Sequence, residues 1–249
     1  MDPVTLEMDS HKIPATPDSA DISKLSLPEF DAGALTEDLA LALLKHSDLA
    51  PEIIQNIDKN SNVMKSRKVR LAVAAHPRTA RRLSLRLIRE SHTGDLARFA
   101  LLPAVAADLK KAAAELLRAR LPSMTVGERI SLARRSPGTV AAALLLDKES
   151  RVWQAALENP RLTEAAIVKA LHRRGASGAL VTFLCCSAKW SMRPEIRAAL
   201  LLNEKTPLVH ALALARTLPP EQLGDILHVS RLPRNVKAQL EETLLDKMP

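Results

Sequence analysis

The sequence predicts an all-α protein made of short helices stacked into a right- or left-handed α-solenoid. Leu and Ala, which both favour helices, fill roughly a third of the 249 residues. Aromatic residues make up only 2% and glycines number only seven, which disfavours a β-sandwich or a glycine-rich nucleotide-binding fold. No segment shows the sustained alternation of apolar and polar residues that marks a strand. With 47% hydrophobic residues, the chain can bury a sizeable core.

Charge is divided unequally along the chain. The formal net charge is +8, but the first 38 residues hold nine Asp and Glu against Lys12 and Lys24, so they carry −7 and the remainder carries +15. Prolines and small polar residues give residues 1–35 the composition of an unfolded tail. We therefore expect an acidic tail over 1–35 and a helical repeat domain over 36–249. The tail either has no special role or lies on the basic body and competes with an acidic ligand.

Helix start signals recur from Thr36 onward and divide the domain into many short helices. Several prolines suit the first position of a helix. They are Pro51, Pro137, Pro194, Pro207, Pro220 and Pro233. Thr125 and Glu128 have the spacing of a capping box. We expect helices of about 8 to 18 residues.

Internal repeats support the solenoid. In three copies, a β-branched residue stands eight positions before a break at Pro77, Pro160 or Glu204, and a second amphipathic run follows the break. The copies cover residues 69–79, 152–162 and 196–206. Because one such unit cannot bury its apolar face alone, neighbouring units are expected to stack. Leu packing into Ala-lined grooves would explain the scarcity of aromatic residues.

One copy carries a longer pattern, D-x-x-x-x-V-x-x-A-x-x-x-N-P-x-L, from Asp147 to Leu162. This pattern resembles bacterial HEAT-like repeats and the leucine-rich repeat variant. The resemblance spans about residues 40–230 and implies an α-solenoid that serves as a protein-binding scaffold. Some leucine-rich repeat variant proteins carry an N-terminal cysteine cluster for an iron–sulfur centre, whereas this chain has no cysteine before Cys185.

No catalytic, cofactor or metal motif is found in the sequence, so we expect neither an enzyme nor a cofactor. The seven histidines lack metal-ligand spacing, and no phosphate-binding or nucleophile-elbow glycine motif occurs. Asp147 is expected to cap the following helix rather than to act as a catalytic carboxylate. Cys185 and Cys186 are expected to be buried structural thiols; a redox-sensing pair is the alternative.

The compartment follows from the same features. Two adjacent cysteines cannot form a disulfide framework, which indicates a reducing compartment. The chain has no signal-peptide pattern at its start and no apolar run long enough to span a bilayer. We expect a cytoplasmic protein that does not insert into membranes.

Four arginines form the strongest binding signal. Arg78, Arg82, Arg86 and Arg89 are spaced 4, 4 and 3 residues apart and would share one stripe of a helix whose other side faces the core. A solvated face is the plain alternative. Further cations follow with few acids between them, and a ridge of cations over successive repeats suits an acidic partner.

The repeats indicate a second set of candidates. The residues that follow the three β-branched anchors are Arg70, Trp153 and Arg197, which would line up in one column of the solenoid. Arg and Trp are enriched at binding hot spots. The alternative for Trp153 is that it packs into a neighbouring repeat.

Two functions follow from these features. The first is a non-catalytic scaffold that binds an acidic partner, expected to be another protein, through its basic face. The second is sequence-independent binding of DNA or RNA, because the chain is similar in size, basicity and repeat type to HEAT-like alkylpurine DNA glycosylases. Those proteins use aromatic residues and an Asp near the lesion, whereas neither Trp153 nor Trp190 has an Asp four residues downstream.

Overall fold

The protein is all-α, as its sequence predicts. The computed structural model describes residues 35–245, which form 17 α-helices and one short 3-10 helix and contain no strand. The predicted acidic tail lies outside the described residues except for Leu35, and the first helix follows directly after its N-cap, Thr36.

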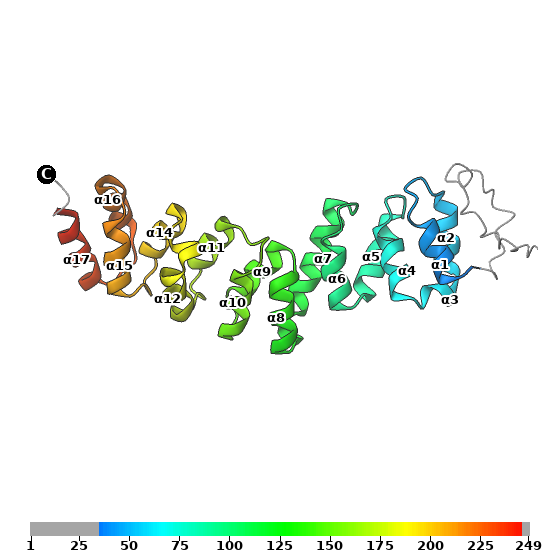
Figure 1. The fold of residues 1–249 in the computed structure, drawn as a ribbon, viewed down its shortest axis with the longest axis horizontal. Helices are drawn as coiled ribbons and strands as arrows, with labels where there is room; N and C mark the ends of the chain where they lie inside the picture. Colours follow the sequence, from blue (N-terminus) through cyan, green and yellow to red (C-terminus); the bar gives the residue numbers. More distant parts are fainter. Residues whose placement is uncertain (1–34, 246–249) are drawn as a thin grey trace, which may run out of the picture.

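The helices run in chain order along the molecule (Figure 1). Their bounds are α1 Glu37–Leu43, α2 Pro51–Lys59, α3 Ser61–Met64, α4 Arg67–Ala75, α5 Arg81–Glu90, α6 Thr93–Phe99, α7 Ala107–Arg120, the 3-10 helix Leu121–Ser123, α8 Val126–Arg135, α9 Gly138–Leu144, α10 Ser150–Leu157, α11 Glu164–Leu171, α12 Gly178–Cys186, α13 Ala188–Ser191, α14 Pro194–Leu201, α15 Leu208–Arg216, α16 Pro220–Val229 and α17 Arg234–Leu245.

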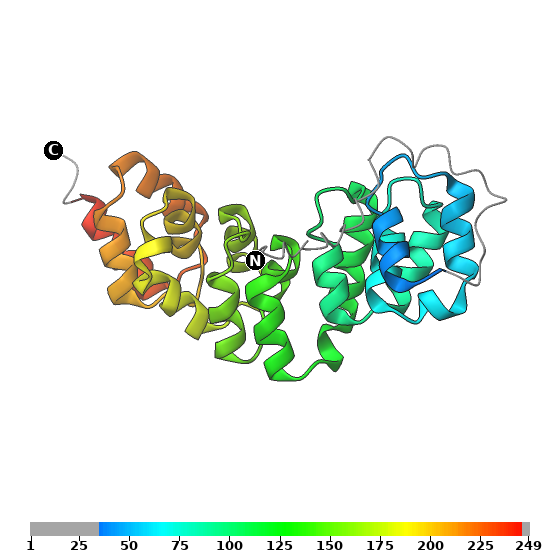
Figure 2. The ribbon, with the colours of Figure 1, turned by 45° about the vertical axis from the view of Figure 1, so that its right-hand side comes forward.

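Contacts are made mainly between helices that are neighbours in the row. The first helices of successive units, α4, α6, α8, α10, α12, α14 and α16, each contact the next of the set. The second helices α5, α7, α9 and α11 do the same beside them. The resulting row is elongated and bends into an arch (Figure 2).

The predicted start signals are used in part: Pro137, Pro207 and Pro233 each stand one residue before the helix instead of at its first position. Pro51, Pro194 and Pro220 occupy the first turn of α2, α14 and α16, where their missing N–H is not needed. Thr125 and Glu128 form the capping box of α8: the Thr125 N–H donates to Glu128 Oε2 at 2.8 Å, and Thr125 Oγ1 accepts from the Glu128 N–H at 3.3 Å. The hydrogen bonds from Thr125 lower the pKa of Glu128 below its ordinary value.

The core is aliphatic and continuous along the row. The three β-branched anchors of the repeats, Val69, Val152 and Ile196, are all fully buried. Buried alanines on α7, α9 and α10 leave room for leucines from neighbouring helices. The packing of Leu against Ala therefore replaces the aromatic core that the composition does not supply.

A column of polar side chains ties each repeat copy to an earlier helix. The residue before each break is His76, Asn159 or Asn203. Asn159 Nδ2 donates to the carbonyls of Ala133, at 2.7 Å, and Ser136, at 3.0 Å, while its Oδ1 accepts from the Arg161 N–H at 2.8 Å. The carbonyls at the end of α8, which have no partner within the helix, are thereby satisfied.

The other two members of the column repeat this pattern. Asn203 donates to the Leu171 carbonyl at 2.7 Å and accepts from the Lys205 N–H at 2.9 Å. His76 places Nε2 at 2.9 Å from the His46 carbonyl and accepts the Arg78 N–H at Nδ1, at 3.2 Å. An Nδ1 that accepts carries no proton, so His76 bonds as the neutral Nε2–H tautomer and mimics an asparagine.

Ion pairs also connect successive helices. Arg67 Nη2 lies 2.8 Å from Asp95 Oδ2, which joins α4 to α6, and Arg81 Nε lies 2.6 Å from Asp108 Oδ2, which joins α5 to α7. The hydrogen bond from Arg81 lowers the pKa of Asp108. These cations belong to the surface of the row, where such pairs contribute little stability.

None of the helices within residues 35–245 combines the length and the apolar character needed to cross a bilayer.

Candidate functional site: a cationic groove between α9 and α11

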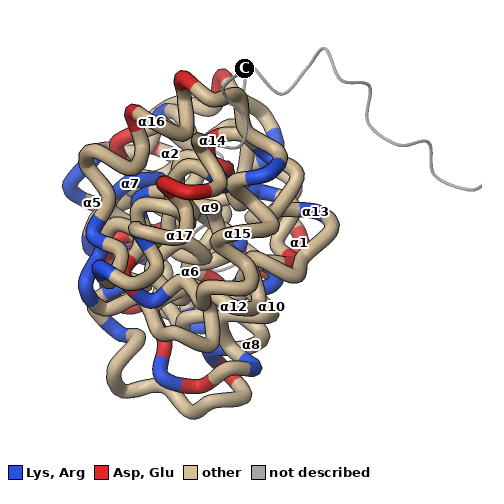
Figure 3. Tube along the Cα trace, turned by 90° about the vertical axis from the view of Figure 1, so that its left-hand side faces the viewer, with Lys and Arg blue, Asp and Glu red and all other residues tan. Residues whose placement is uncertain are grey.

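The described part of the chain is strongly basic. Residues 35–245 contain 33 Lys and Arg against 20 Asp and Glu. Viewed along the row, basic positions gather along the edge that includes α5 and α7 (Figure 3). The cations that remain without an acidic partner determine where an acidic molecule can bind.

The predicted arginine stripe is only partly formed. Helix α5 begins at Arg81, so Arg78 lies in the preceding turn and not on the helix, which corrects the sequence-based expectation. Arg86 donates to both carboxylate oxygens of Asp58, at 2.7 and 2.9 Å. The side chains of Arg82 and Arg89 are exposed and have no partner among the described residues. Two of the four arginines are thus free to bind a ligand.

The cations predicted beside the stripe are mostly engaged within the protein. Arg120 donates to the carbonyls of Ser91, at 2.6 Å, and Arg89, at 2.7 Å. Arg129 Nε lies 2.9 Å from Asp147 Oδ2, with both side chains largely buried. Asp147 also accepts the Glu149 N–H at 3.0 Å; it therefore braces the turn before α10 but is not the N-cap residue.

A groove with free cations lies between α9 and α11. It has a volume of about 450 Å³, and its lining includes the half-buried Ala142 and Ala143 of α9 and the half-buried Leu146 just after that helix. Its charged lining residues are Arg118, Arg161, Lys169 and Arg173, and none of its lining residues is acidic. Apart from Arg118, which lies 4.0 Å from Glu115, these side chains have no partner in the described structure.

The local sequence explains the groove. Helix α9 has the sequence Gly-Thr-Val-Ala-Ala-Ala-Leu and carries no charge, so it provides an apolar floor. Lys169 lies in the last turn of α11 and Arg173 in the connection that follows the helix, and both line the groove. Arg161 lies in the turn before α11, and Asn159 fixes that turn through the Arg161 N–H.

Gly138 brings the turn close to α9. A Cβ atom added to Gly138 would overlap the backbone carbonyl of Arg161. The first residue of α9 can therefore approach the α10–α11 turn this closely only because it has no side chain. Gly138 and Asn159 together set the position of the wall that carries Arg161.

The second set of candidates does not form one surface. Trp153 is only 3% exposed and packs edge-on against Phe183 of α12, with ring centroids 5.3 Å apart. Arg197 is half-buried and donates to Thr217 Oγ1 at 2.9 Å. Arg70 is half-buried and has no partner among the described residues. In this structure Trp153 therefore serves the packing between repeats.

A different column of the same repeats carries exposed cations. Two positions after His76, Asn159 and Asn203 come Arg78, Arg161 and Lys205. All three lie in the turns that the polar column fixes. This column is visible in the repeat alignment, two positions after the residue that precedes each break.

The cysteine pair differs from the expectation of two buried thiols. Cys185 is half-buried, and burial, helped by the neighbouring Cys186, raises its pKa to about 11. Cys186 is exposed, and its Sγ lies 3.8 Å from Nε2 of His210 on α15. This contact could not be predicted from the sequence, because the two residues are 24 positions apart.

The two thiols should therefore react at different rates. We expect iodoacetamide at pH 7.5 to label Cys186 first. Cys185 should react on the order of a hundredfold more slowly than an ordinary thiol, because its pKa is raised from 9.0 to about 11 and only the thiolate attacks. Tandem mass spectrometry of the peptide over time distinguishes the adjacent sites. Equal rates for Cys185 and Cys186 would contradict this assignment.

No group of three or more His, Cys, Asp or Glu within residues 35–245 is placed to hold a metal ion. The fold and the groove define an all-α protein of stacked helical units with a cationic, apolar-floored groove on one side. Comparisons with protein-family models, with curated proteins and with solved structures gave no match to this chain.

Proposed function

We propose that this protein is a non-catalytic helical-repeat scaffold, of the HEAT-like kind, that binds an acidic segment of another protein in the groove between α9 and α11. The main support for this proposal is that the groove combines a floor lined by alanine and leucine with free cations and has no acidic lining residue. Such a groove suits a segment in which acidic and apolar side chains alternate. The free cysteines fit a reducing compartment such as the cytoplasm.

The groove favours a protein partner over a nucleic acid. A phosphate backbone would use the cations but has no apolar side chain for the floor. Binding of single strands usually relies on stacking between bases and aromatic side chains. Trp153 and Trp190 are only 3% and 4% exposed, so neither offers such a platform. Sequence-independent duplex binding through phosphate contacts is the alternative that the test below must exclude.

Neutralising two groove cations should weaken binding of an acidic peptide. The probe is a fluorescein-labelled 12-residue peptide of alternating Glu and Leu, followed by fluorescence anisotropy. The double variant R161Q/K169Q should bind about tenfold or more weakly, because it removes two charge-assisted contacts. R82Q/R89Q removes the same charge from exposed, unpartnered arginines of α5 and should change the affinity less than twofold.

Two further probes separate the alternatives. Polyglutamate of equal charge should bind the full chain more weakly than the alternating peptide, since it leaves the apolar floor uncovered. A 20-base-pair duplex should bind weakly at 150 mM salt. If the duplex binds more tightly than the peptide, with a steep salt dependence, the nucleic-acid alternative replaces this proposal.

A further inference from the structure

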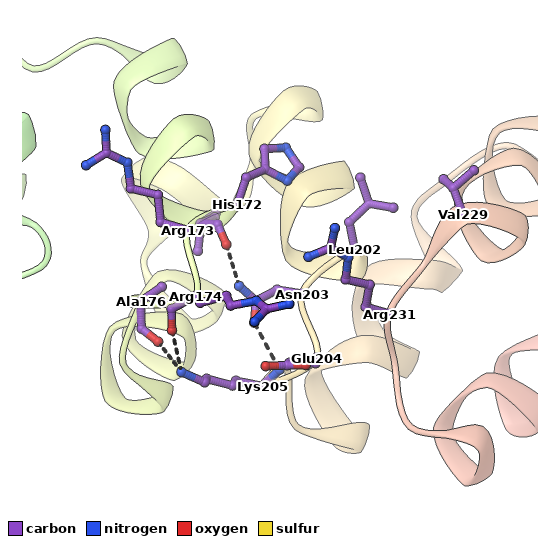
Figure 4. A pocket seen from close by; sticks show the side chains of 11 residues that line it. His172, Arg173, Arg174, Ala176, Leu202, Asn203, Glu204, Lys205, Val229 and Arg231 are labelled. Atoms are coloured by element: carbon purple, nitrogen blue, oxygen red, sulfur yellow. Dashed lines mark hydrogen bonds between the residues drawn. The ribbon is translucent and has the colours of Figure 1, made fainter.

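A second cavity lies next to the groove, where three interhelix loops meet (Figure 4). It has a volume of about 230 Å³ and is lined from the α11–α12, α14–α15 and α16–α17 connections. Arg173 borders both cavities, and in Figure 4 its side chain extends away from the cluster of the other polar groups. The two cavities are therefore neighbours that share Arg173, and their other lysines and arginines differ.

Hydrogen bonds fix two of the three walls of this cavity. Lys205 Nζ donates to the carbonyls of Arg174, at 3.2 Å, and Ala176, at 2.6 Å. Asn203 holds the Leu171 carbonyl and the Lys205 N–H from the opposite side. The backbone of the α11–α12 loop is thereby tied to the α14–α15 loop, so these two walls are held in place before a ligand binds.

Two arginine guanidinium groups line this cavity and form no hydrogen bond or ion pair with the described residues. Arg174 comes from the α11–α12 loop and Arg231 from the α16–α17 loop, and neither side chain has a partner among the described residues. The ammonium group of Lys205 adds a positive charge, although its hydrogen bonds go to backbone carbonyls. Glu204 is the one acid among the lining residues. The cavity is therefore a net-positive site with two walls held in place.

We propose that Arg174 and Arg231 form a binding site for a dianionic phosphate group. Each guanidinium offers several N–H donors in a planar fork, and two forks from opposite walls need a ligand with oxygens on more than one side. A carboxylate has two oxygens and is satisfied by one bidentate arginine. A phosphate monoester carries three terminal oxygens and a charge of about −1.5 to −2 at pH 7, so it can bridge both arginines.

The site can be tested separately from the acidic-peptide groove, because Arg174 and Arg231 line this cavity and not the groove. Its phosphate could be free or esterified to a side chain of a bound protein. Both sources present the same phosphate oxygens to the two arginines. The affinity for O-phosphoserine relative to that for inorganic phosphate distinguishes them. Tighter binding of O-phosphoserine indicates the ester, and tighter binding of inorganic phosphate indicates the free ion; both support the site.

The test is calorimetric titration of the full chain at pH 7.5 and fixed ionic strength. Inorganic phosphate and O-phosphoserine should each bind at one site, and acetate should bind at least tenfold more weakly. R174Q/R231Q should weaken phosphate binding about tenfold or more. The matched control R151Q/R234Q removes two exposed arginines elsewhere and should stay within twofold of the parent protein.

Protonation of the ligand gives a second check. The second pKa of a phosphate monoester is about 6, so O-phosphoserine binding should weaken as the pH falls from 7.5 to 5. Acetate binding as tight as phosphate binding, or an unchanged affinity in R174Q/R231Q, would overturn the phosphate site. Because R174Q/R231Q should still bind the alternating Glu–Leu peptide, failure of this site is distinguishable from failure of the groove.

Discussion

Replacing Asn159 with alanine is expected to lower the free energy of unfolding by about 3 kcal/mol, because it leaves buried polar groups without partners. Asn159 is 1% exposed and makes three hydrogen bonds, to the Ala133 carbonyl, the Ser136 carbonyl and the Arg161 N–H. Urea unfolding, followed both by circular dichroism and by tryptophan fluorescence, measures the loss.

Two variants test whether hydrogen bonding, rather than packing, causes this loss. Asn159→Asp keeps the shape and the acceptor but directs a carboxylate at two carbonyl oxygens, so it should destabilise at least as much as Asn159→Ala. His76→Asn should cost less than about 1 kcal/mol, because Asn serves this role at 159 and 203, whereas His76→Ala should cost about 2 kcal/mol. Equal destabilisation by His76→Asn and His76→Ala would contradict the assignment of the same hydrogen-bonding role to His76, Asn159 and Asn203.

Gly138→Ala is expected to destabilise by about 3 kcal/mol, and it should also weaken binding in the groove. The new methyl group would overlap the Arg161 carbonyl, a backbone atom that cannot rotate away. Relief requires α9 to separate from the turn before α11, which exposes core and moves the wall that carries Arg161. Urea unfolding and anisotropy with the alternating Glu–Leu peptide measure the two effects.

Gly127→Ala is the matched control. Gly127 also lies near the start of a helix, α8, but it is exposed and a Cβ there would meet nothing within 4 Å. The substitution should stabilise by about 0.5 to 1 kcal/mol, because alanine loses less backbone entropy in a helix. Equal effects of the two substitutions would show that Gly138 is not selected by its contact with the Arg161 carbonyl.

The repeats could be recognised in the sequence because they depend on local rules. Val69, Val152 and Ile196 were aligned as anchors, and all three are fully buried. The prolines and the Thr125–Glu128 box mark helix starts through backbone chemistry that acts within one turn. The same alignment contained the column of His76, Asn159 and Asn203, but the carbonyls that they bind are 23 to 32 residues away.

The binding residues were harder to predict, because a cation's availability depends on distant acids. Arg86 looked as free as Arg82 in the sequence, but Asp58, 28 residues earlier, engages it. Trp153 occupied a promising repeat position and is buried against Phe183. Arg161 and Lys169 belong to no cationic run of the sequence, although they border a groove without acidic lining residues.

By itself, the sequence determined the all-α class, the short helices, the buried anchors of the three repeat copies and the basic character of the body. Each of these follows from propensity, capping or composition, which act within a few residues. Only the tertiary structure decided which cations stay unpaired, where the apolar floor lies, and how the Arg174 and Arg231 loops meet. Those features depend on side chains from separate units that come together only when the helices stack.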